Sequence, residues 1–329
     1  MRRLIAASLV VAAVIVAALA GTAAAADDTL VLYTSQPNTD AQATADAFMA
    51  ANPGVKVDWV RDGTPKIIAK LRAEIEAGSP QPDVLLISDM VTMESLKRDN
   101  LLAAYPGAPV AGYDPAIMDK DFTYFSTKLI TTGIVYNTKA AMKPQSWLDL
   151  TKPAAKDEVT MPSPLASGAA MIHTMTLAGN LPGGWDFYTA LAKNGAVAAG
   201  ANGDVETAVA GGDKLYGMIV DYLPIREAAK GAPVAFVFPK EGVSAVTEPV
   251  AILKSARHPD LAKKFVDFVL SQQGQQLWSR LGYIPADPKV ALPPGYPDRS
   301  AIKVLPYDPA AAVTDDAQNK QKFADIFAQ

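Results

Sequence analysis

Short apolar segments rich in β-branched residues alternate with amphipathic helical segments along most of this 329-residue chain. In the first third, the expected strands cover 29–35, 55–60 and 82–88, and the expected helices between them cover 39–54 and 64–78. The second of these helices has Pro65 in its first turn and ends at Gly78, as capped helices do. Such alternation predicts an α/β fold with a largely parallel sheet covered by helices.

The second half of the chain repeats the alternation with different details. Expected strands cover 128–137, the region of Val159, 215–222 and 245–253, and expected helices cover the region after Ser167, 185–195 and 258–278. The run KLITTGIVYN (128–137) is long enough to pass from one lobe to another. Because about 300 residues exceed what one compact core usually holds, we expect two lobes.

The first 26 residues have the pattern of an export signal. Two arginines at 2–3 precede an apolar stretch over 4–20, and the alanines at 24–26 match an A-x-A cleavage site. A transmembrane anchor is the alternative, because the apolar run is nearly long enough to cross a membrane. Alanine-rich composition and the cleavage site favour a cleavable signal peptide over 1–26, and a periplasmic mature protein that begins near Asp27.

The chain has no cysteine, which excludes disulfides and a lipid anchor attached through cysteine. Removal of residues 1–26 changes the formal charge from −4 to −6, because that segment holds two arginines and no acidic residue. Charges of both signs are interspersed, without the basic run or aromatic-basic stripe of a nucleic-acid site. We therefore expect a free, monomeric protein that does not bind nucleic acid.

The stretch MPSPLASGAAM (161–171) places two prolines between an expected strand end and a helix that begins at Ser167. Gly168 and Ala169 follow, so small side chains leave the backbone open to close approach. Free N–H groups and the positive dipole end of a helix N-terminus make an anion site. The alternative is an ordinary serine cap, which contributes about 1 kcal/mol to stability.

Several segments, in this order, resemble those of the periplasmic solute-binding proteins of ABC importers, in the branch that includes the ferric-iron binders. They are VLYTSQ, SWLDLTKP, MPSPLASGA, GMIVDYLP and FVFPKEG followed by EPVAI, within residues 29–285. The resemblance implies a two-lobed type II binding protein, with crossing strands as a hinge and the ligand cleft between the lobes. It also implies discontinuous lobes, the first over 27–128 and 246–290 and the second over 129–245 and 291–329.

The iron binders of this branch carry two adjacent tyrosines, because ferric iron prefers phenolate and carboxylate oxygens. At the matching place Tyr222 takes the first position, but Leu223 takes the second and Asp221 replaces an asparagine. The histidine often found after the first strand is also missing, since Gln36 and Pro37 stand there. Leucine cannot ligate iron, so a ferric-binding protein with a synergistic anion becomes the alternative, and we expect no metal or cofactor.

Other members of the branch carry phosphorylated or phosphonated solutes: sugar phosphates, aminoethylphosphonate, pyridoxal phosphate, or thiamine and its phosphates. The resemblance implies that a Ser-Gly-Ala segment binds the anion and that an asparagine faces it. The expected ligand-binding residues are therefore Ser35, Ser167, Gly168, Ala169, Asn202, Asp221, Tyr222 and Glu248. Asn202 has the alternative reading of a helix cap, and Glu248 that of an ordinary exposed acid; a buried Asp221 would suit an ammonium or a sugar hydroxyl.

Little in the sequence points to catalysis. The only histidines are His173 and His258, and the G-x-S-x-G, H-E-x-x-H, P-loop and dinucleotide motifs are absent. A glycosidase-like pair of carboxylates stays open, because such pairs meet in space rather than in sequence. A periplasmic hydrolase on the same fold is thus the second alternative to a carrier. The resemblance implies an inner-membrane ABC permease and a cytoplasmic ATPase as partners.

Overall fold

The structure is a computed structural model, and it describes residues 29–198 and 200–328. The predicted signal peptide, 1–26, lies outside the described residues. Within them, no helix has the length and apolar character needed to cross a membrane.

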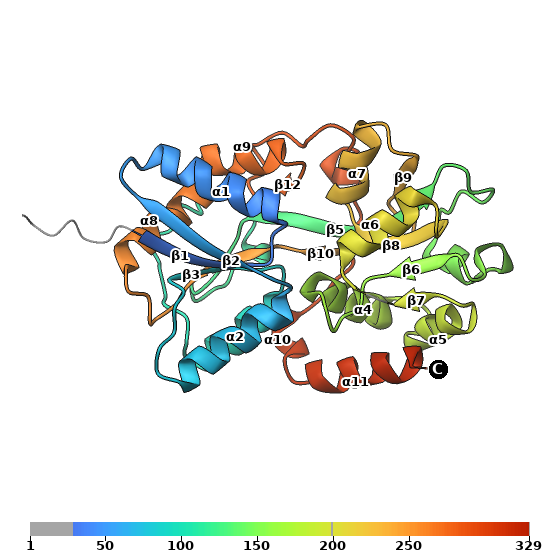
Figure 1. Cartoon of the computed structure of the whole chain (residues 1–329), viewed down its shortest axis with the longest axis horizontal. Coiled ribbons are helices and arrows are strands. Elements are labelled where there is room, and N and C mark those ends of the chain that lie inside the picture. The colour runs from blue at the N-terminus through green and yellow to red at the C-terminus, as the bar shows by residue number, and fades with distance from the viewer. Residues whose placement is uncertain (1–28, 199, 329) are drawn as a thin grey trace, which may run out of the picture.

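The first of two sheets has the strand order β2-β1-β3-β11-β4, with β1, β2 and β3 parallel. Its strands are β1 (Thr29–Thr34), β2 (Lys56–Arg61), β3 (Val84–Leu86), β4 (Phe125–Ser126) and β11 (Pro249–Ile252). Its helices are α1 (Asn38–Ala51), α2 (Thr64–Glu76), α3 (Met90–Arg98), α8 (Pro259–Leu270) and α9 (Gln272–Arg280). In Figure 1, α1 and α9 lie above this sheet and α2 lies below it, and we call the whole unit the first lobe.

The second sheet has the order β10-β5-β8-β6-β7, and β9 and β12 also pair with β5. Its strands are β5 (Lys128–Asn137), β6 (Val159–Met161), β7 (Val197–Ala198), β8 (Tyr216–Val220), β9 (Val234–Val237), β10 (Ser244–Val246) and β12 (Ile284–Pro285). Its helices are α4 (Gly168–Asn180), α5 (Trp185–Lys193), α6 (Asn202–Gly211) and α7 (Tyr222–Ala229). We call this unit the second lobe; its sheet is mixed, since β5 runs antiparallel to β8, β9 and β10.

The predicted α/β fold with two lobes is therefore confirmed. The prediction of a largely parallel sheet holds for β1, β2 and β3 but not for the second sheet. The cause is the long strand β5, which enters from the first lobe and pairs with strands that run against it. The lobe boundaries expected from the sequence stay a prediction.

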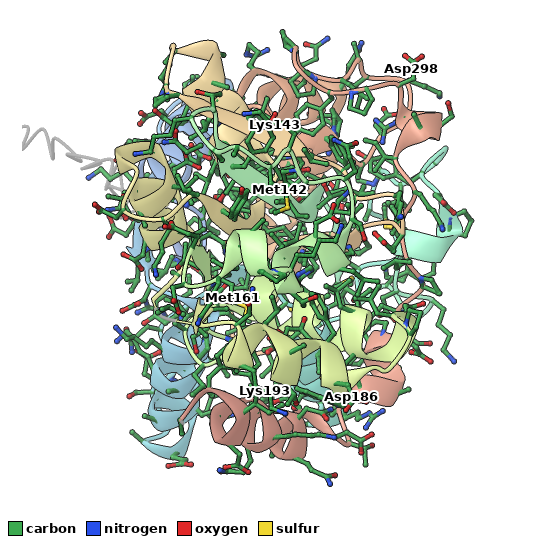
Figure 2. The ribbon with its side chains drawn as sticks, turned by 90° about the vertical axis from the view of Figure 1, so that its right-hand side faces the viewer. Met142, Lys143, Met161, Asp186, Lys193 and Asp298 are labelled. Atoms are coloured by element: carbon green, nitrogen blue, oxygen red, sulfur yellow. The ribbon has the colours of Figure 1, made fainter. Side chains whose placement is uncertain are left out.

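The C-terminal segment contacts both lobes through α10 (Pro309–Ala312) and α11 (Asp316–Phe327). Arg98 of α3 donates a hydrogen bond to the carbonyl of Ala310 at 2.6 Å. The ring of Phe323 packs 5.9 Å from that of Tyr188, on α5. In Figure 2, where Asp186 and Lys193 mark α5, α11 lies directly below this helix. Short 3-10 helices cover Pro115–Ile117, Trp147–Thr151, Pro153–Ala155 and Arg299–Ala301.

Two crossings of the chain between the lobes are adjacent, from β4 to β5 and from β10 to β11, and a third leads from α9 to β12. Thr127 joins the two adjacent crossings, because its N–H donates to Thr247 O at 3.2 Å and its hydroxyl to Glu248 O at 2.7 Å. Lys128, fully buried, pairs with the Glu248 carboxylate, and its Nζ lies 3.6 Å from the centroid of the Trp278 ring. Burial lowers the pKa of Lys128, while the Glu248 carboxylate opposes that shift.

We expect Lys128→Met to lower the free energy of unfolding by about 3 to 5 kcal/mol, because it leaves the buried Glu248 carboxylate without its cation. The double variant Lys128→Met/Glu248→Gln should lose clearly less stability, since it removes both charges. Urea unfolding followed by circular dichroism measures both. An unchanged midpoint for Lys128→Met would contradict a structural role for the pair.

Candidate functional site

A cavity of about 180 Å³ lies between the two lobes, at the carboxyl ends of strands from both sheets. The polar residues that line it are Ser35, Arg61, Thr64 and Ser88 of the first lobe, and Ser167, Asn202 and Tyr222 of the second. Gly168 and Ala169 complete the wall at the start of α4. Six of the eight residues expected from the sequence thus line one cavity, and their contact with a ligand stays a prediction.

Of the helices that begin at this cavity, α7 has its first N–H, that of Tyr222, paired with Asp221; the other three are α2 at Thr64, α4 at Gly168 and α6 at Asn202. Each directs its unpaired N–H groups and positive dipole end towards the same space, which favours an anion there. Ser167 is the N-cap of α4, since its Oγ accepts a hydrogen bond from the N–H of Ala170 at 3.3 Å. Ser167 therefore caps the helix, as the alternative interpretation predicts, and lines the cavity as well.

The hydroxyl groups of the lining hold protons that a ligand could accept. Ser167 Oγ accepts from Ala170 and also from Asn202 Nδ2, at 3.3 Å each, so its own proton remains available. Ser35 Oγ accepts from the N–H of Ser88 at 2.8 Å. Thr64 Oγ1 is buried and has no hydrogen-bond partner in the described part of the chain. These hydroxyls suit the oxygens of an anion.

Arg61 adds a full positive charge to this cavity. It is the last residue of β2, and its Nε donates to the carbonyl of Gln36 at 2.7 Å, which orients the guanidinium. Among the described lining residues, it is the one with an ionised side chain. Sequence reasoning missed Arg61, Thr64 and Ser88. The available signal was their position near the ends of expected strands: Arg61 follows 55–60, Ser88 ends 82–88, and Thr64 begins the helix after Arg61. Strand ends face the crevice in such folds.

Asn202 connects the two helices of the second lobe that face the cavity. Its Nδ2 donates to Ser167, and its Oδ1 accepts from the N–H of Val220 at the end of β8, at 3.1 Å. The helix-cap reading of Asn202 is wrong, because the N-cap of α6 is Ala201. Asp204, in the first turn of α6, accepts from the Ala201 N–H at 2.7 Å.

Tyr222 brings an aromatic surface to the cavity and connects it to a contact between the lobes. Its ring lies 4.5 Å from the guanidinium of Arg226, which pairs at 3.0 Å with Asp40 of α1. The ring of Tyr283 lies 4.4 Å from that of Tyr222, and Tyr283 donates to Asp40 as well. Burial raises the pKa of Tyr222, so its phenol is neutral.

Asp221 and Glu248 lie outside the lining of the cavity. The Asp221 carboxylate accepts from the Thr131 hydroxyl at 2.6 Å, the Thr131 N–H at 3.1 Å and the Tyr222 N–H at 2.7 Å, and burial raises its pKa to about 6. Glu248 accepts from Ser88 at 2.7 Å and pairs with Lys128. Each carboxylate would have to give up these hydrogen bonds or its ion pair to bind a solute. Their contact with a solute therefore stays a prediction.

The charges near the two tyrosines are already matched in pairs, Asp40 with Arg226 and Glu248 with Lys128. A metal ion there would have to displace a cation of the protein. Over the described residues, no group of three or more His, Cys, Asp or Glu side chains could hold a metal ion. The neighbourhood of Tyr222 therefore resembles a charge-balanced contact more than a metal centre.

Two glycines allow the lobes to touch across the cavity. A Cβ at Gly168 would lie 2.8 Å from both Ser88 O and Asp89 Cβ, and one at Gly63 would lie 2.5 Å from Ala166 O. These distances are too short for real contacts, and each joins one lobe to the other. Gly168 is thus required by the approach of the opposite lobe, in addition to leaving space for a ligand.

Comparison with known proteins places the chain in a group of binding proteins. The family model described as "Bacterial extracellular solute-binding protein" matches residues 33–276. An uncharacterized protein of Haemophilus influenzae is 29% identical over 301 residues, which are 86% of this chain and 85% of that protein. The Fe(3+)-binding periplasmic protein of Serratia marcescens is 24% identical over 263 residues, which are 77% of this chain and 76% of that protein.

Among solved structures, the periplasmic binding protein AfuA from Actinobacillus pleuropneumoniae, with exogenous fructose-6-phosphate bound, has a TM-score of 0.83 to this chain. The two are 26% identical, and the match covers 91% of this chain and 98% of AfuA. The similarity extends over both lobes, so the predicted class of fold, a two-lobed periplasmic binding protein, is confirmed.

We expect Gly168→Ala to weaken ligand binding at least about tenfold, because its methyl group meets the opposite lobe only when the lobes approach. Gly179→Ala, on the same helix with nothing within 4 Å of the new carbon, is the matched control and should bind normally. Isothermal titration calorimetry measures affinity, and urea unfolding should show little change for either variant. Equal affinities for both variants would contradict the closure contact.

The buried Glu206 of α6 predicts a pH dependence of stability. Its side chain is 8% exposed, and neither carboxylate oxygen has a hydrogen-bond partner within the described residues. Burial raises its pKa from 4.5 to about 7; the charge of Glu227 also raises this pKa, and that of Lys230 lowers it. The protonated form is favoured in the fold, so this stability is present below pH 4.5 and lost as the pH rises towards 7. Glu206→Gln should flatten this fall in urea unfolding between pH 4.5 and 8; an unchanged slope would contradict the assignment.

Proposed function

Since the chain belongs to the bacterial extracellular solute-binding protein family, whose members bind small solutes for ABC transporters, we propose that its own solute is a small phosphorylated or phosphonated organic anion. The observation that carries this proposal is the convergence of the N-termini of α2, α4 and α6, the hydroxyl groups of Ser35, Thr64 and Ser167, and Arg61 on one cavity whose described lining has no carboxylate. A phosphoryl group fits such a set of donors, since it presents several acceptor oxygens and a negative charge.

The charge of the lining also discriminates among the candidate solutes. Aminoethylphosphonate and thiamine phosphates carry a cationic group, and the described lining offers no carboxylate to pair with it. Sugar phosphates carry no cationic group, and Tyr222 and Leu223 provide a surface for a sugar ring. Fructose-6-phosphate in the similar AfuA supports the sugar-phosphate class. We therefore place sugar phosphates first.

Ferric iron is the alternative, supported by the Serratia marcescens relative and by Tyr222 in the lining. Against it, Leu223 lines the cavity where a second tyrosine would be needed, and the nearby carboxylates are paired with cations. A hydrolase is the second alternative, and it would convert a bound phosphoester.

The proposal includes a periplasmic, monomeric carrier released by cleavage of the predicted signal peptide. Its partners would be an inner-membrane permease and a cytoplasmic ATPase, and the closed form would be the one recognised, because closure makes occupancy visible on the outer surface. The hinge would lie at the crossings from β4 to β5 and from β10 to β11.

Native mass spectrometry of protein purified gently from its own periplasm tests the solute class. An added mass of an organic phosphate or phosphonate, lost on unfolding, is the expected result. An added iron, alone or with a simple anion, would favour the ferric alternative, and an unphosphorylated solute would keep the carrier but discard the phosphate site. Release of inorganic phosphate from candidate phosphoesters would indicate a hydrolase.

We expect Arg61→Gln to weaken binding of fructose 6-phosphate by about 10- to 100-fold, the cost of one charged hydrogen bond. Lys66→Gln is the matched control, since it removes the same charge from an exposed side chain outside the described lining. Calorimetric titration at constant ionic strength compares them. Equal losses in the two variants would indicate a general charge effect and contradict a direct role for Arg61.

A further inference from the structure

Ser88 differs from the other hydroxyl-bearing residues of the cavity in the direction of its hydrogen bond. It lies between β3 and the Asp89 cap of α3, and it lines the cavity. Its N–H donates to Ser35 Oγ at 2.8 Å, and its Oγ lies 2.7 Å from Glu248 Oε1. Since an ionised carboxylate only accepts hydrogen bonds, the Ser88 proton is directed to Glu248.

The environment of the Glu248 carboxylate keeps Ser88 as the donor in this hydrogen bond. Glu248 is 1% exposed, and its second oxygen pairs with the fully buried Lys128. A buried carboxylate beside a buried ammonium is retained as an ion, because removing either charge strands the other. A serine hydroxyl has one proton and two lone pairs, so Ser88 has only lone pairs left for the cavity.

Four of the other polar residues that line the cavity can donate hydrogen bonds to a solute. Ser35 and Ser167 already accept hydrogen bonds and keep their protons, Thr64 has no partner in the described chain, and Arg61 only donates. An anion with acceptor oxygens alone would satisfy these groups but place a lone pair against Ser88. An anion that also carries a hydroxyl would satisfy every one of them.

We propose that Ser88 is a specificity-determining acceptor that restricts the cavity to anions bearing a hydroxyl group, such as a singly protonated phosphate or phosphate ester, and rejects sulfate. Glu248 is then a positioning residue that acts through Ser88, rather than a direct ligand. This inference rests on the proposed function, because it requires an anion in the cavity.

The experiment compares inorganic phosphate with sulfate by calorimetric titration at pH 6, where sulfate carries no proton. Wild-type protein should bind phosphate about 10- to 100-fold more tightly than sulfate, the effect of one hydrogen bond to a charged group. Ser88→Ala should lose affinity for phosphate but not for sulfate, so that the ratio approaches one. Thr64→Val, which removes a donor without a partner in the described chain, should weaken both anions alike and keep the ratio.

Two further measurements guard against a variant that fails to fold. Ser88→Thr keeps the hydroxyl and should keep the preference for phosphate. Wild-type protein titrated with methyl phosphate, which has no other hydroxyl, should lose affinity as the pH rises past the second pKa of the ester, about 6. Affinity for sulfate, measured in parallel, corrects for changes in the protein itself.

The outcomes separate the inference from its premise. If the wild type binds phosphate and sulfate equally, or if Ser88→Ala keeps the preference, the role of Ser88 is overturned while the anion site stands. If the wild type binds neither inorganic anion, methyl phosphate nor fructose 6-phosphate, the proposed function is overturned and the inference with it.

Discussion

The buried ion pair between Lys128 and Glu248 is the interaction on which the arrangement of the two lobes depends. It lies where the chain crosses between the sheets, with the Lys128 ammonium against the rings of Trp278 and Tyr283. Burying two charges costs several kcal/mol per ion before their attraction is counted, so such a pair contributes more to geometry than to net stability. Here it fixes both crossings side by side and directs the Ser88 hydroxyl.

From this pair, contacts lead to the cleft through aromatic rings. Tyr283 packs against Lys128 and donates to Asp40, Asp40 pairs with Arg226, and Arg226 lies on the face of Tyr222 in the cavity wall. In this network each cation is paired with a carboxylate, Lys128 with Glu248 and Arg226 with Asp40. The charge of the described cavity lining is therefore that of Arg61. The crossings, the contact between the lobes and the cavity wall at Tyr222 are therefore joined by one network of charges and rings.

The sequence predicts the α/β lobes because strand and helix periodicity are local, and it predicts Ser167 because capping depends on adjacent residues. It does not predict the convergence of Arg61, Thr64 and Ser88, since these follow strands that become neighbours only through the order β2-β1-β3. The Lys128–Glu248 pair joins residues 120 positions apart, and no local pattern marks it. Asp221 was expected to contact a solute, but its carboxylate is directed to Thr131 of β5, an orientation that depends on packing between strands distant in the sequence.

The two glycines at the contact between the lobes explain why selection and closure should occur together. The first lobe supplies Ser88 and Thr64, and the second supplies Gly168, where a Cβ would lie only 2.8 Å from Ser88 O and 3.1 Å from Thr64 Oγ1. The set of donors and the Ser88 acceptor thus exist as one site only when the lobes approach. Closure also removes water, which strengthens satisfied hydrogen bonds and raises the cost of an unsatisfied one. A solute without a hydroxyl would therefore be rejected mainly in the closed form. The contacts that close the lobes around Gly168 are then also the ones that bring Ser88 to the solute.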